Sequence, residues 1–492
     1  MVGLPARGKT YLAKKIQRYL RWLGIDTEIF NVGCERQKLA NHIDHTFFDF
    51  HNANGMSQRE QAAETTLTAM LNWFDEGKGT VGIYDGSNCT RARRAWIHKE
   101  LTSRGIEVLF IESICQDESI IQSNIQDIIS KNPDYQDMDP ADAEADFKER
   151  VKHYEEMYET ITEDHLTYLK IIDANQQCII NLVRGYLESR IVYFLMNVKI
   201  RPKSIWFSRV SREKDVMDDM DHLSLDSFFQ HGESQFNVED KIGGDADLSS
   251  RGQMYASRLP DLIKEHVGDR PLTVWTSSMK RTIQTASHLP YPKKSWKALD
   301  ELNTGVCDGM TYAEIEVCKD DVESWWIFIY MHTYRKSIQK TLHVEMRINS
   351  TIDIGVERQV EHEKISYRDL VLRVEPIIME LERHDNILLV AHQATLRCIF
   401  AYFLDVGHDE LPYIKVPLHT LIELIPNAHG CEKHYYRGNI EAVDTFRPKG
   451  DRVTKLKDTD ASNAGAIGEI ADAKNPILPL SPKLYPKKST TH

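Results

Sequence analysis

The chain has 492 residues, of which 41% are hydrophobic and 27% charged, a balance typical of a globular protein with two or three domains. Its formal net charge of −13 argues against nucleic acid and anionic membranes as main partners. The eight cysteines lack the paired spacing of zinc sites, and we recognise neither a signal peptide nor an apolar run that would span a bilayer. We therefore expect reduced thiols and a cytoplasmic location.

The first ten residues carry the most specific motif. Residues 3–10, GLPARGKT, fit the phosphate-binding pattern G-x-x-x-x-G-K-[ST]. In such a loop the backbone N–H groups point at one anion, Lys9 faces the β- and γ-phosphates, and the Thr10 hydroxyl faces Mg²⁺. Apolar periodicity over 11–23 predicts that a helix follows, which places the phosphate at a helix N-terminus. A buried strand normally precedes this loop. Only Met1 and Val2 precede the loop. We therefore expect either that another part of the chain supplies the strand or that the chain is truncated at its N-terminus, and we favour truncation.

Strand-like and helix-like segments alternate through the first half, which predicts a parallel sheet with helices on both faces. The expected strands are 27–32, 80–84, 108–112 and 168–172, and the expected helices are 57–74, 143–160 and 185–197. A second α/β segment begins near residue 204. Its expected strands are 205–208, 272–276 and 386–390, and its expected helices are 251–266, 367–383 and 394–404. The polar composition after about residue 448 predicts a disordered tail.

Charged side chains follow the strand expected at 80–84. Asp85 comes at its end, where a carboxylate can bind Mg²⁺, accept a proton from a hydroxyl, or cap the next helix. Several arginines are either a solvated surface or a binding site for an anionic acceptor, because guanidinium binds phosphate in bidentate fashion. They are Arg36, Arg59, Arg91, Arg93 and Arg94.

Five stretches of the first half resemble 6-phosphofructo-2-kinase. They are GLPARGKT (3–10), FNVG (30–33) with Arg36, YD (84–85) with Asn88 and Arg93-Arg94, FIES (110–113) with Cys115, and PDY (133–135). The resemblance implies a P-loop kinase domain over 1–200 that uses ATP and Mg²⁺. It implies ATP contacts at Gly3, Leu4, Pro5, Ala6, Arg7, Gly8, Lys9, Thr10, Tyr11 and Asn124, and a metal site at Thr10 and Asp85. It also implies active-site roles for Asp85 and Cys115, and fructose 6-phosphate contacts at Arg36, Arg59, Ser87, Arg93, Arg150 and Tyr154.

The chain departs from this family pattern near the expected substrate phosphates. Ile129 stands where the family has a lysine, and Lys131 is out of register. Glu35 adds a carboxylate beside Arg36, and Gln37 replaces a second arginine. These changes predict a weakened kinase.

Two histidine motifs mark the second half, His231-Gly232-Glu233 and Ala391-His392-Gln393. An imidazole is a good nucleophile at neutral pH, and nearby cations stabilise a transferring phosphoryl group. Together with HGESQFN, KIGGDADLS, SSMKRTIQTA, DELNTGVCDGMTY and PLHT, they resemble fructose-2,6-bisphosphatase, the partner domain of the same bifunctional family, which has a phosphoglycerate-mutase-like histidine phosphatase fold. The resemblance places this domain at 201–447 and the tail at 448–492.

The same resemblance assigns roles in this domain. It makes His231 the phosphohistidine and Glu301 the proton donor, with His392 beside them. It implies contacts with the phosphoryl group or the sugar bisphosphate at Arg209, Asn237, Gly243, Arg281, Tyr312, Tyr367, Gln393 and Arg397.

Two blocks of the second half do not fit the family. Residues 210–230 separate Arg209 from His231, which are adjacent in the family, and 317–365 are unrelated to it. The first block is either a functional loop or, as we prefer, a retained intron. The chain is then a bifunctional enzyme that makes and hydrolyses fructose 2,6-bisphosphate, an enzyme with one of these activities, or a non-catalytic nucleotide- or sugar-phosphate-binding regulator. A homodimer is left open.

Overall fold

The computed structural model describes most of both predicted domains. The described residues are 1–39, 44–136, 138–199, 204–210, 233–239, 241, 243–302, 308–311, 314, 367–426 and 430–440. His231, Tyr312, most of the two atypical blocks and the tail lie outside them. Among the described helices, none is both long and apolar enough to cross a bilayer.

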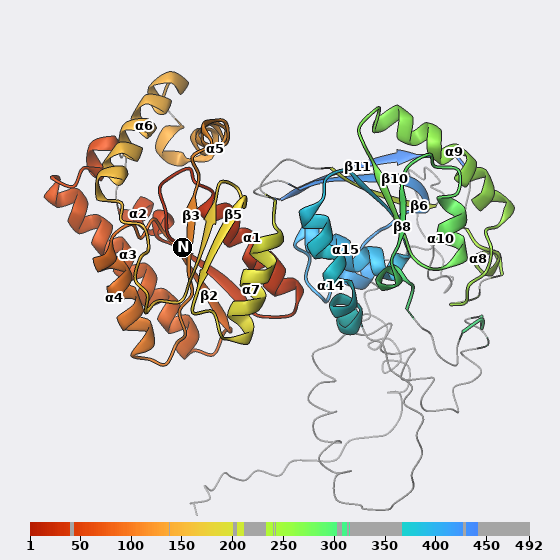
Figure 1. Ribbon diagram of the computed structural model, residues 1–492, viewed down its shortest axis with the longest axis horizontal. Helices are drawn as coiled ribbons and strands as arrows, with labels where there is room; N and C mark the ends of the chain where they lie inside the picture. Colours follow the sequence, from red (N-terminus) through yellow and green to blue (C-terminus); the bar gives the residue numbers. More distant parts are fainter. Residues whose placement is uncertain are drawn as a thin grey trace, which may run out of the picture. The chain divides into compact units, whose positions relative to one another are not determined.

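The first half is an α/β unit (Figure 1). Its strands are β1 (Thr27–Asn31), β2 (Val81–Asp85), β3 (Phe110–Ile114), β4 (Tyr168–Ile172) and β5 (Gln177–Asn181). Its helices are α1 (Lys9–Trp22), α2 (Val32–Leu39), α3 (Ala53–Asp75), α4 (Arg91–Thr102), α5 (Glu118–Lys131), α6 (Pro140–Met157) and α7 (Tyr186–Asn197), with short 3-10 turns η1 (His45–Phe48) and η2 (Pro133–Tyr135). β1 pairs in parallel with β2, and β3 with β4, while β5 is antiparallel to β4. These strands form two sheets, β1-β2 and β3-β4-β5, so the predicted parallel pairing is confirmed within each sheet, and β5 was not part of the prediction.

The two residues before the phosphate-binding loop take the place of the expected strand. The Val2 N–H donates to the Ile111 carbonyl at 2.7 Å, and the Val2 carbonyl accepts from the Ser113 N–H at 2.9 Å. Val2 is thus bridged in parallel to β3 and is fully buried. This short segment enters the loop from inside the sheet, as a longer strand would.

The two faces of these strands are covered by different helices. Ile83 and Ile111 pack with apolar residues of α1 and α7, such as Leu12 and Phe194. Their chain neighbours point to the opposite face, where α3 and α4 supply Leu67, Met70, Leu71, Ile97 and Leu101. This alternation follows from the two-residue period of a strand.

The second half contains a six-stranded sheet in the order β11-β10-β6-β9-β7-β8. Its strands are β6 (Ile205–Val210), β7 (Thr273–Thr276), β8 (Lys293–Ser295), β9 (Ile387–Val390), β10 (His419–Pro426) and β11 (Cys431–Arg437). Its helices are α8 (Gln235–Val238), α9 (Ser250–His266), α10 (Lys280–Thr285), α14 (Tyr367–Arg383) and α15 (Gln393–Leu404), with 3-10 turns η3 (Lys297–Leu299) and η7 (Leu411–Tyr413). β6, β9, β7 and β8 are parallel, and β10 is antiparallel to β6 and β11.

Helices again cover both faces of this sheet. Phe207 and Leu389 pack with α14 and α15, while Trp206 and Leu388 pack with α9. All three predicted strands and all three predicted helices of this half are present within three residues of their expected ends. β8, β10 and β11 were not predicted.

Candidate active sites

The phosphate-binding loop is held by close backbone contacts. Gly3 has φ +135°, and a Cβ there would lie 2.5 Å from the Ser113 carbonyl oxygen, so that side chains are excluded. Gly8, with φ +83°, precedes α1 and aligns the N-terminal N–H groups of that helix with the loop. Asn124, expected at ATP, donates to the Ala6 carbonyl at 3.0 Å and so braces the loop from α5.

The residues predicted to bind metal are brought together. The Thr10 hydroxyl donates to Asp85 Oδ2 at 2.8 Å, and Asn31 Nδ2 donates to the same oxygen at 2.7 Å. Asn31 is paired with Asp85 in the register of β1 and β2, so both side chains leave the carboxyl edge of the sheet together. The sequence analysis missed Asn31, although its place at the end of the first expected strand was a usable signal.

Lys9 is buried against the loop. Its Nζ donates to the Leu4 carbonyl at 2.6 Å. Burial lowers the pKa of Lys9 to about 8, an effect opposed by the nearby Asp85 carboxylate. The side chain therefore carries its charge at neutral pH and loses it in mildly alkaline solution.

One cavity of about 740 Å³ joins this loop to the predicted sugar-phosphate residues. The predicted site residues that line it are Pro5, Ala6, Lys9, Thr10, Arg36, Arg59, Asp85, Ser87, Arg93, Arg150 and Tyr154. Two substrates of the size of a nucleotide and a sugar phosphate fit a cavity of this order.

Two arginines in this cavity share a single carboxylate. Arg36 lies 2.6 Å from Asp134 Oδ2, and Arg150 lies 3.9 Å from the same oxygen. Both guanidinium groups also lie over the Phe48 ring, at 5.0 and 4.0 Å from its centroid. Burial and the neighbouring Arg150 lower the pKa of Arg36, but an arginine stays protonated, so this cluster keeps one positive charge in excess. Such a site suits the phosphate of a sugar.

Arg59, expected to contact fructose 6-phosphate, donates hydrogen bonds to backbone carbonyls. Its Nη1 donates to the Phe48 carbonyl at 3.1 Å and its Nη2 to the Asp49 carbonyl at 3.3 Å. The side chain borders the cavity while it fixes the segment that carries the Phe48 ring.

Cys115 does not line the cavity. Its Sγ faces the Asp117 carbonyl at 4.0 Å, and burial raises the pKa of the thiol, which stays protonated at neutral pH. Its geometry favours a supporting position at the end of β3 over a chemical role.

Ile129, Lys131 and Glu35 lie outside the cavity, whereas Gln37 lines it and donates from Nε2 to Asn132 Oδ1 at 2.8 Å. Ile129 packs against an apolar cluster that includes Ile125 and Phe147. Lys131 forms a surface ion pair with Asp127, and Glu35 pairs with Lys38 at 2.5 Å. The Glu35 carboxylate is therefore neutralised by its own helix.

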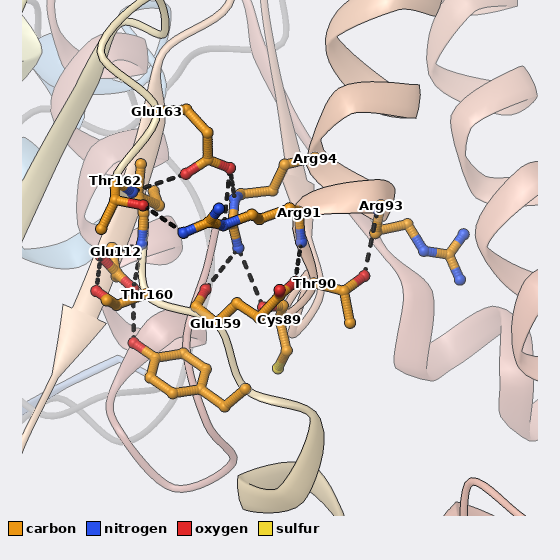
Figure 2. A network of polar contacts seen from close by, with 12 residues as sticks. Cys89, Thr90, Arg91, Arg93, Arg94, Glu112, Glu159, Thr160, Thr162 and Glu163 are labelled. Atoms are coloured by element: carbon orange, nitrogen blue, oxygen red, sulfur yellow. Dashed lines mark hydrogen bonds and ion pairs between the residues drawn. The ribbon is translucent and has the colours of Figure 1, made fainter.

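A buried network supports the loop between β2 and α4 (Figure 2). Arg94, fully buried, donates from Nη2 to Glu163 Oε1 at 2.8 Å and from Nη1 to the Cys89 and Glu159 carbonyls at 3.0 and 2.8 Å. Its neighbour Arg93 points away, over the Trp96 ring and along the cavity wall. One arginine therefore holds the loop while the other stays available to a ligand.

The second site lies at the carboxyl edge of the six-stranded sheet. Ser208 and Thr276 are both paired with Val390, so that the pairing of β6 and β7 with β9 ends at the same level. The next residues along the chain lead directly to Arg209, Ser277 and His392. Polar groups at this edge are where ligands bind in open α/β sheets.

His392 is completely buried there. Its Nε2 lies 2.7 Å from Ser277 Oγ, which in turn lies 2.8 Å from Thr282 Oγ1. Burial, reinforced by the cations Arg281 and Arg373, lowers the pKa of His392 well below its usual value, so the imidazole is neutral at pH 7. Ser277 was not predicted, although it directly follows an expected strand.

Arg281 is the buried cation of this site. Its Nη1 donates to the Gly244 carbonyl at 2.5 Å, next to the predicted contact Gly243, whose φ is +69°. Burial lowers the pKa of Arg281 to about 10, which leaves it charged at neutral pH. Arg281 lies at the start of α10, in the motif SSMKRTIQTA, which follows β7 at the sheet edge.

Three other predicted substrate residues lie around α14 and α15. Gln393 and Arg397 are almost fully buried on α15, and Arg397 Nε donates to the Ile414 carbonyl at 3.0 Å. Tyr367 begins α14. Burial raises the pKa of its hydroxyl, and the positive charge of Arg397 partly offsets this increase.

Four predicted site residues have side chains outside the described part of the chain. His231 and Tyr312 lie outside the described residues, and so do the side chains of Arg209 and Asn237. Glu233, from the same motif as His231, is fully buried, accepts from the Ser249 hydroxyl at 2.6 Å, and pairs with Arg251 at 2.7 Å. This carboxylate anchors the motif to α9.

The two halves thus present two classes of site: a P-loop kinase cavity, and a histidine-centred phosphatase site at the edge of a second sheet. Residues 1–202 match the family of 6-phosphofructo-2-kinase, and residues 228–437 match the histidine phosphatase superfamily (branch 1).

Relatives of similar length carry both parts. The chain is 43% identical to Fructose-2,6-bisphosphatase of Saccharomyces cerevisiae, over 92% of this chain and 90% of that protein. It is 40% identical to human 6-phosphofructo-2-kinase/fructose-2,6-bisphosphatase 1, over 92% of this chain and 87% of that one, and 39% identical to the Gallus gallus bifunctional enzyme, with the same coverage. The chain belongs to the 6-phosphofructo-2-kinase/fructose-2,6-bisphosphatase family.

A solved alpha-ribazole phosphatase from Shigella flexneri is also similar, with 19% identity, coverage of 49% of this chain and 99% of that one, and a TM-score of 0.33. A similarity of this size carries no argument about function.

Proposed function

We propose that this chain both synthesises and hydrolyses fructose 2,6-bisphosphate. The observation that carries the kinase half is the single cavity in which Lys9, Thr10 and Asp85 meet the arginines Arg36 and Arg150. Family membership with both domains supports the combination. The alternatives of one surviving activity, or of a non-catalytic regulator, have weaker support because Glu35 and Ile129 lie outside the cavity, while Gln37, which lines it, places a neutral amide donor 3.4 Å from the Asp134 carboxylate.

In the kinase reaction, ATP phosphates bind the loop from Gly3 to Tyr11, and the sugar phosphate binds between Arg36 and Arg150. Thr10 and Asp85 offer hydroxyl and carboxylate oxygens 2.8 Å apart, the donor chemistry that Mg²⁺ prefers. Bound Mg²⁺ would neutralise charge on the β- and γ-phosphates. Asp85, at the cavity wall, is also placed to accept the proton of the attacking 2-hydroxyl.

In the phosphatase reaction, His231 attacks the 2-phosphoryl group and Glu301 protonates the leaving oxygen. Arg281 and Asn237 stabilise the negative charge of the transferring group, and neutral His392 donates or accepts a hydrogen bond there. Gln393, Arg397 and Tyr367 hold the sugar bisphosphate. Water then hydrolyses the phosphohistidine. We expect these reactions to take place in the cytoplasm, without nucleic acid or a membrane as partner, and leave a homodimer open.

Both activities are tested on the full chain. Fructose 6-phosphate with γ-labelled MgATP should yield labelled fructose 2,6-bisphosphate, and bisphosphate labelled at the 2-phosphate should leave acid-labile label on histidine. The Asp85→Asn variant should lower the kinase activity by about 100-fold, the His231→Ala variant should abolish the histidine labelling, and each should spare the other activity. A chain that binds ATP but shows neither reaction would contradict the proposal.

A deletion variant decides the status of the first atypical block. Removal of 210–230 restores Arg209 next to His231, as in the family. If histidine is labelled in the deleted form alone, the block is an off-switch or an intron remnant. If both forms are labelled, it is a tolerated loop. If neither is labelled, either His231 is not the nucleophile or the block 317–365 has destroyed the site, and a binding regulator becomes the better proposal.

A further inference from the structure

The segment Asp300–Glu301 is tied down at the edge of the phosphatase site. It directly follows η3, and it carries the proposed proton donor. The Asp300 carboxylate accepts from the Ser278 N–H at 2.7 Å and from the Ser278 hydroxyl at 2.6 Å. These contacts fix the side chain of Asp300 to the loop after β7. They do not involve the backbone carbonyls of Asp300 and Glu301.

Arg373 holds those carbonyls. It lies on α14, some seventy residues away along the chain, and its guanidinium spans two successive peptide groups. Nη2 donates to the Asp300 carbonyl, and the two terminal nitrogens lie 3.4 and 3.5 Å from the Glu301 carbonyl. Thr395 on α15 adds a hydroxyl donor to the Asp300 carbonyl at 3.1 Å. The backbone of the donor residue is thus fixed from two helices.

The charge of Arg373 reaches the reacting groups as well. Burial lowers its pKa, while the carboxylates of Glu301 and Asp300 raise it, so the cation lies within their field. The same cation contributes to the lowered pKa of His392. The charge of Arg373 therefore acts on both the proposed donor and the second histidine, while its hydrogen bonds go to the Asp300 and Glu301 carbonyls.

We propose that Arg373 is a positioning residue of the phosphatase reaction, which fixes the Asp300–Glu301 backbone so that the Glu301 carboxyl meets the leaving oxygen. The inference rests on the proposed role of Glu301. In the step concerned, a histidine nitrogen forms a bond to phosphorus while the bond from phosphorus to the sugar 2-oxygen breaks. The Glu301 proton moves to that oxygen, which leaves fructose 6-phosphate with a free 2-hydroxyl. Arg373 acts on the proton transfer and makes no bond to the substrate.

An arginine suits this task better than a lysine. Its planar guanidinium presents several donors in a fixed geometry, so one side chain reaches two adjacent carbonyls without loss of orientation. A lysine would keep the charge but contact one carbonyl at a time. The two effects of Arg373, charge and orientation, are therefore separable by substitution.

The experiment compares two substrates that differ in their need for a proton. Fructose 2,6-bisphosphate loses an alkoxide that must be protonated, whereas p-nitrophenyl phosphate loses a phenolate that leaves unprotonated. Arg373→Met should lower kcat/KM for the bisphosphate by about 10- to 100-fold, within the range of general acid catalysis, and change that for the aryl ester by less than about threefold. Arg373→Lys should fall between wild type and Arg373→Met.

Controls separate positioning from folding and from direct contact. Arg383→Met, on the same helix, removes an exposed side chain paired with Glu380 at 3.5 Å and should leave both rates unchanged. The aryl phosphate rate reports whether each variant is folded at its active site. Equal losses on both substrates for Arg373→Met would overturn the proposal, since they indicate phosphoryl contact or misfolding.

Glu301→Gln decides which inference fails. If Arg373 acts through Glu301, the double variant Glu301→Gln with Arg373→Met is no slower on the bisphosphate than Glu301→Gln alone. Additive losses would overturn the positioning role and keep the donor. If Glu301→Gln slows both substrates equally, Glu301 is not the proton donor, and both the donor assignment and the role of Arg373 fall.

Discussion

Arg94→Met should loosen the loop that follows Asp85 and leads into α4 beside the kinase cavity. The substitution keeps an unbranched apolar stem but removes the guanidinium group, with its charge and its donors. Glu163, whose side chain is 15% exposed, loses its ion-pair partner. The carbonyls of Cys89 and Glu159 lose hydrogen bonds from Arg94 Nη1 with lengths of 3.0 and 2.8 Å. Cys89 is buried, so little water can replace the arginine at its carbonyl.

The expected loss of local stability follows from these contacts. Breaking a buried ion pair costs about 3–5 kcal/mol, and a hydrogen bond to a charged group contributes about 1.5–3 kcal/mol. Because Glu163 is partly exposed and regains some hydration, we expect about 3 kcal/mol for the segment from β2 to α4. At about 1.4 kcal/mol per factor of ten, this raises the local opening equilibrium by about 100-fold.

Hydrogen exchange followed by mass spectrometry measures this opening in peptides that cover residues 86–102. Arg91→Met is the matched control, because Arg91 lies three residues earlier and its side chain donates to the exposed Thr162 hydroxyl at 2.8 Å. A surface substitution of this kind changes stability by less than about 0.5 kcal/mol. If the two variants exchanged at rates within about threefold of each other, the account of Arg94 as the anchor of this loop would be refuted.

Three further outcomes are expected. Asp85→Asn should keep the contact with Thr10 but lower the kinase kcat by about 100-fold and leave histidine labelling intact, and a kinase that tolerated the change would exclude Asp85 from the reaction. Binding of a non-hydrolysable ATP analogue should weaken as the pH rises through about 8, by at most tenfold per pH unit, because Lys9 is charged below its pKa of about 8 and neutral above it. An affinity that stayed constant from about pH 7 to 9.5 would show that the Lys9 charge is not needed. Ser277→Ala should lower phosphatase turnover by about tenfold through the lost contact with His392, with partial recovery in Ser277→Thr, while kinase activity is unaffected. Equal rates for the two variants would show that the hydroxyl does not orient His392.

Much of this architecture could be predicted because the strands are buried. A run such as β9, whose four residues are all buried, stands out from its polar flanks, and the residue after it is therefore placed at the sheet edge. β11 could not be predicted in this way. Four consecutive residues of it are exposed, and so its sequence lacks the apolar alternation that indicates a strand.

The site residues that were missed depend on contacts between distant segments. Asp134 lies 98 residues from Arg36, and nothing near either residue in the sequence signals their pairing. Arg373 likewise lies within the expected helix 367–383, where an arginine is ordinarily a surface residue. Motifs supplied the groups that meet the substrates, whereas the groups that hold those residues in place emerged from the packing of the folded chain.

The surplus positive charge shared by Arg36, Asp134 and Arg150 limits what this cluster can distinguish. A pair of guanidinium groups attracts any phosphate dianion, whether it belongs to a sugar, a nucleotide or the solvent. Discrimination among phosphates must then come from the uncharged wall of the same cavity, where Ser87 and Tyr154 can form hydrogen bonds with hydroxyls of one particular sugar. Substitution of Arg36 or Arg150 should weaken the binding of all phosphate compounds alike. Substitution of Ser87 or Tyr154 should change which phosphate compound binds most tightly.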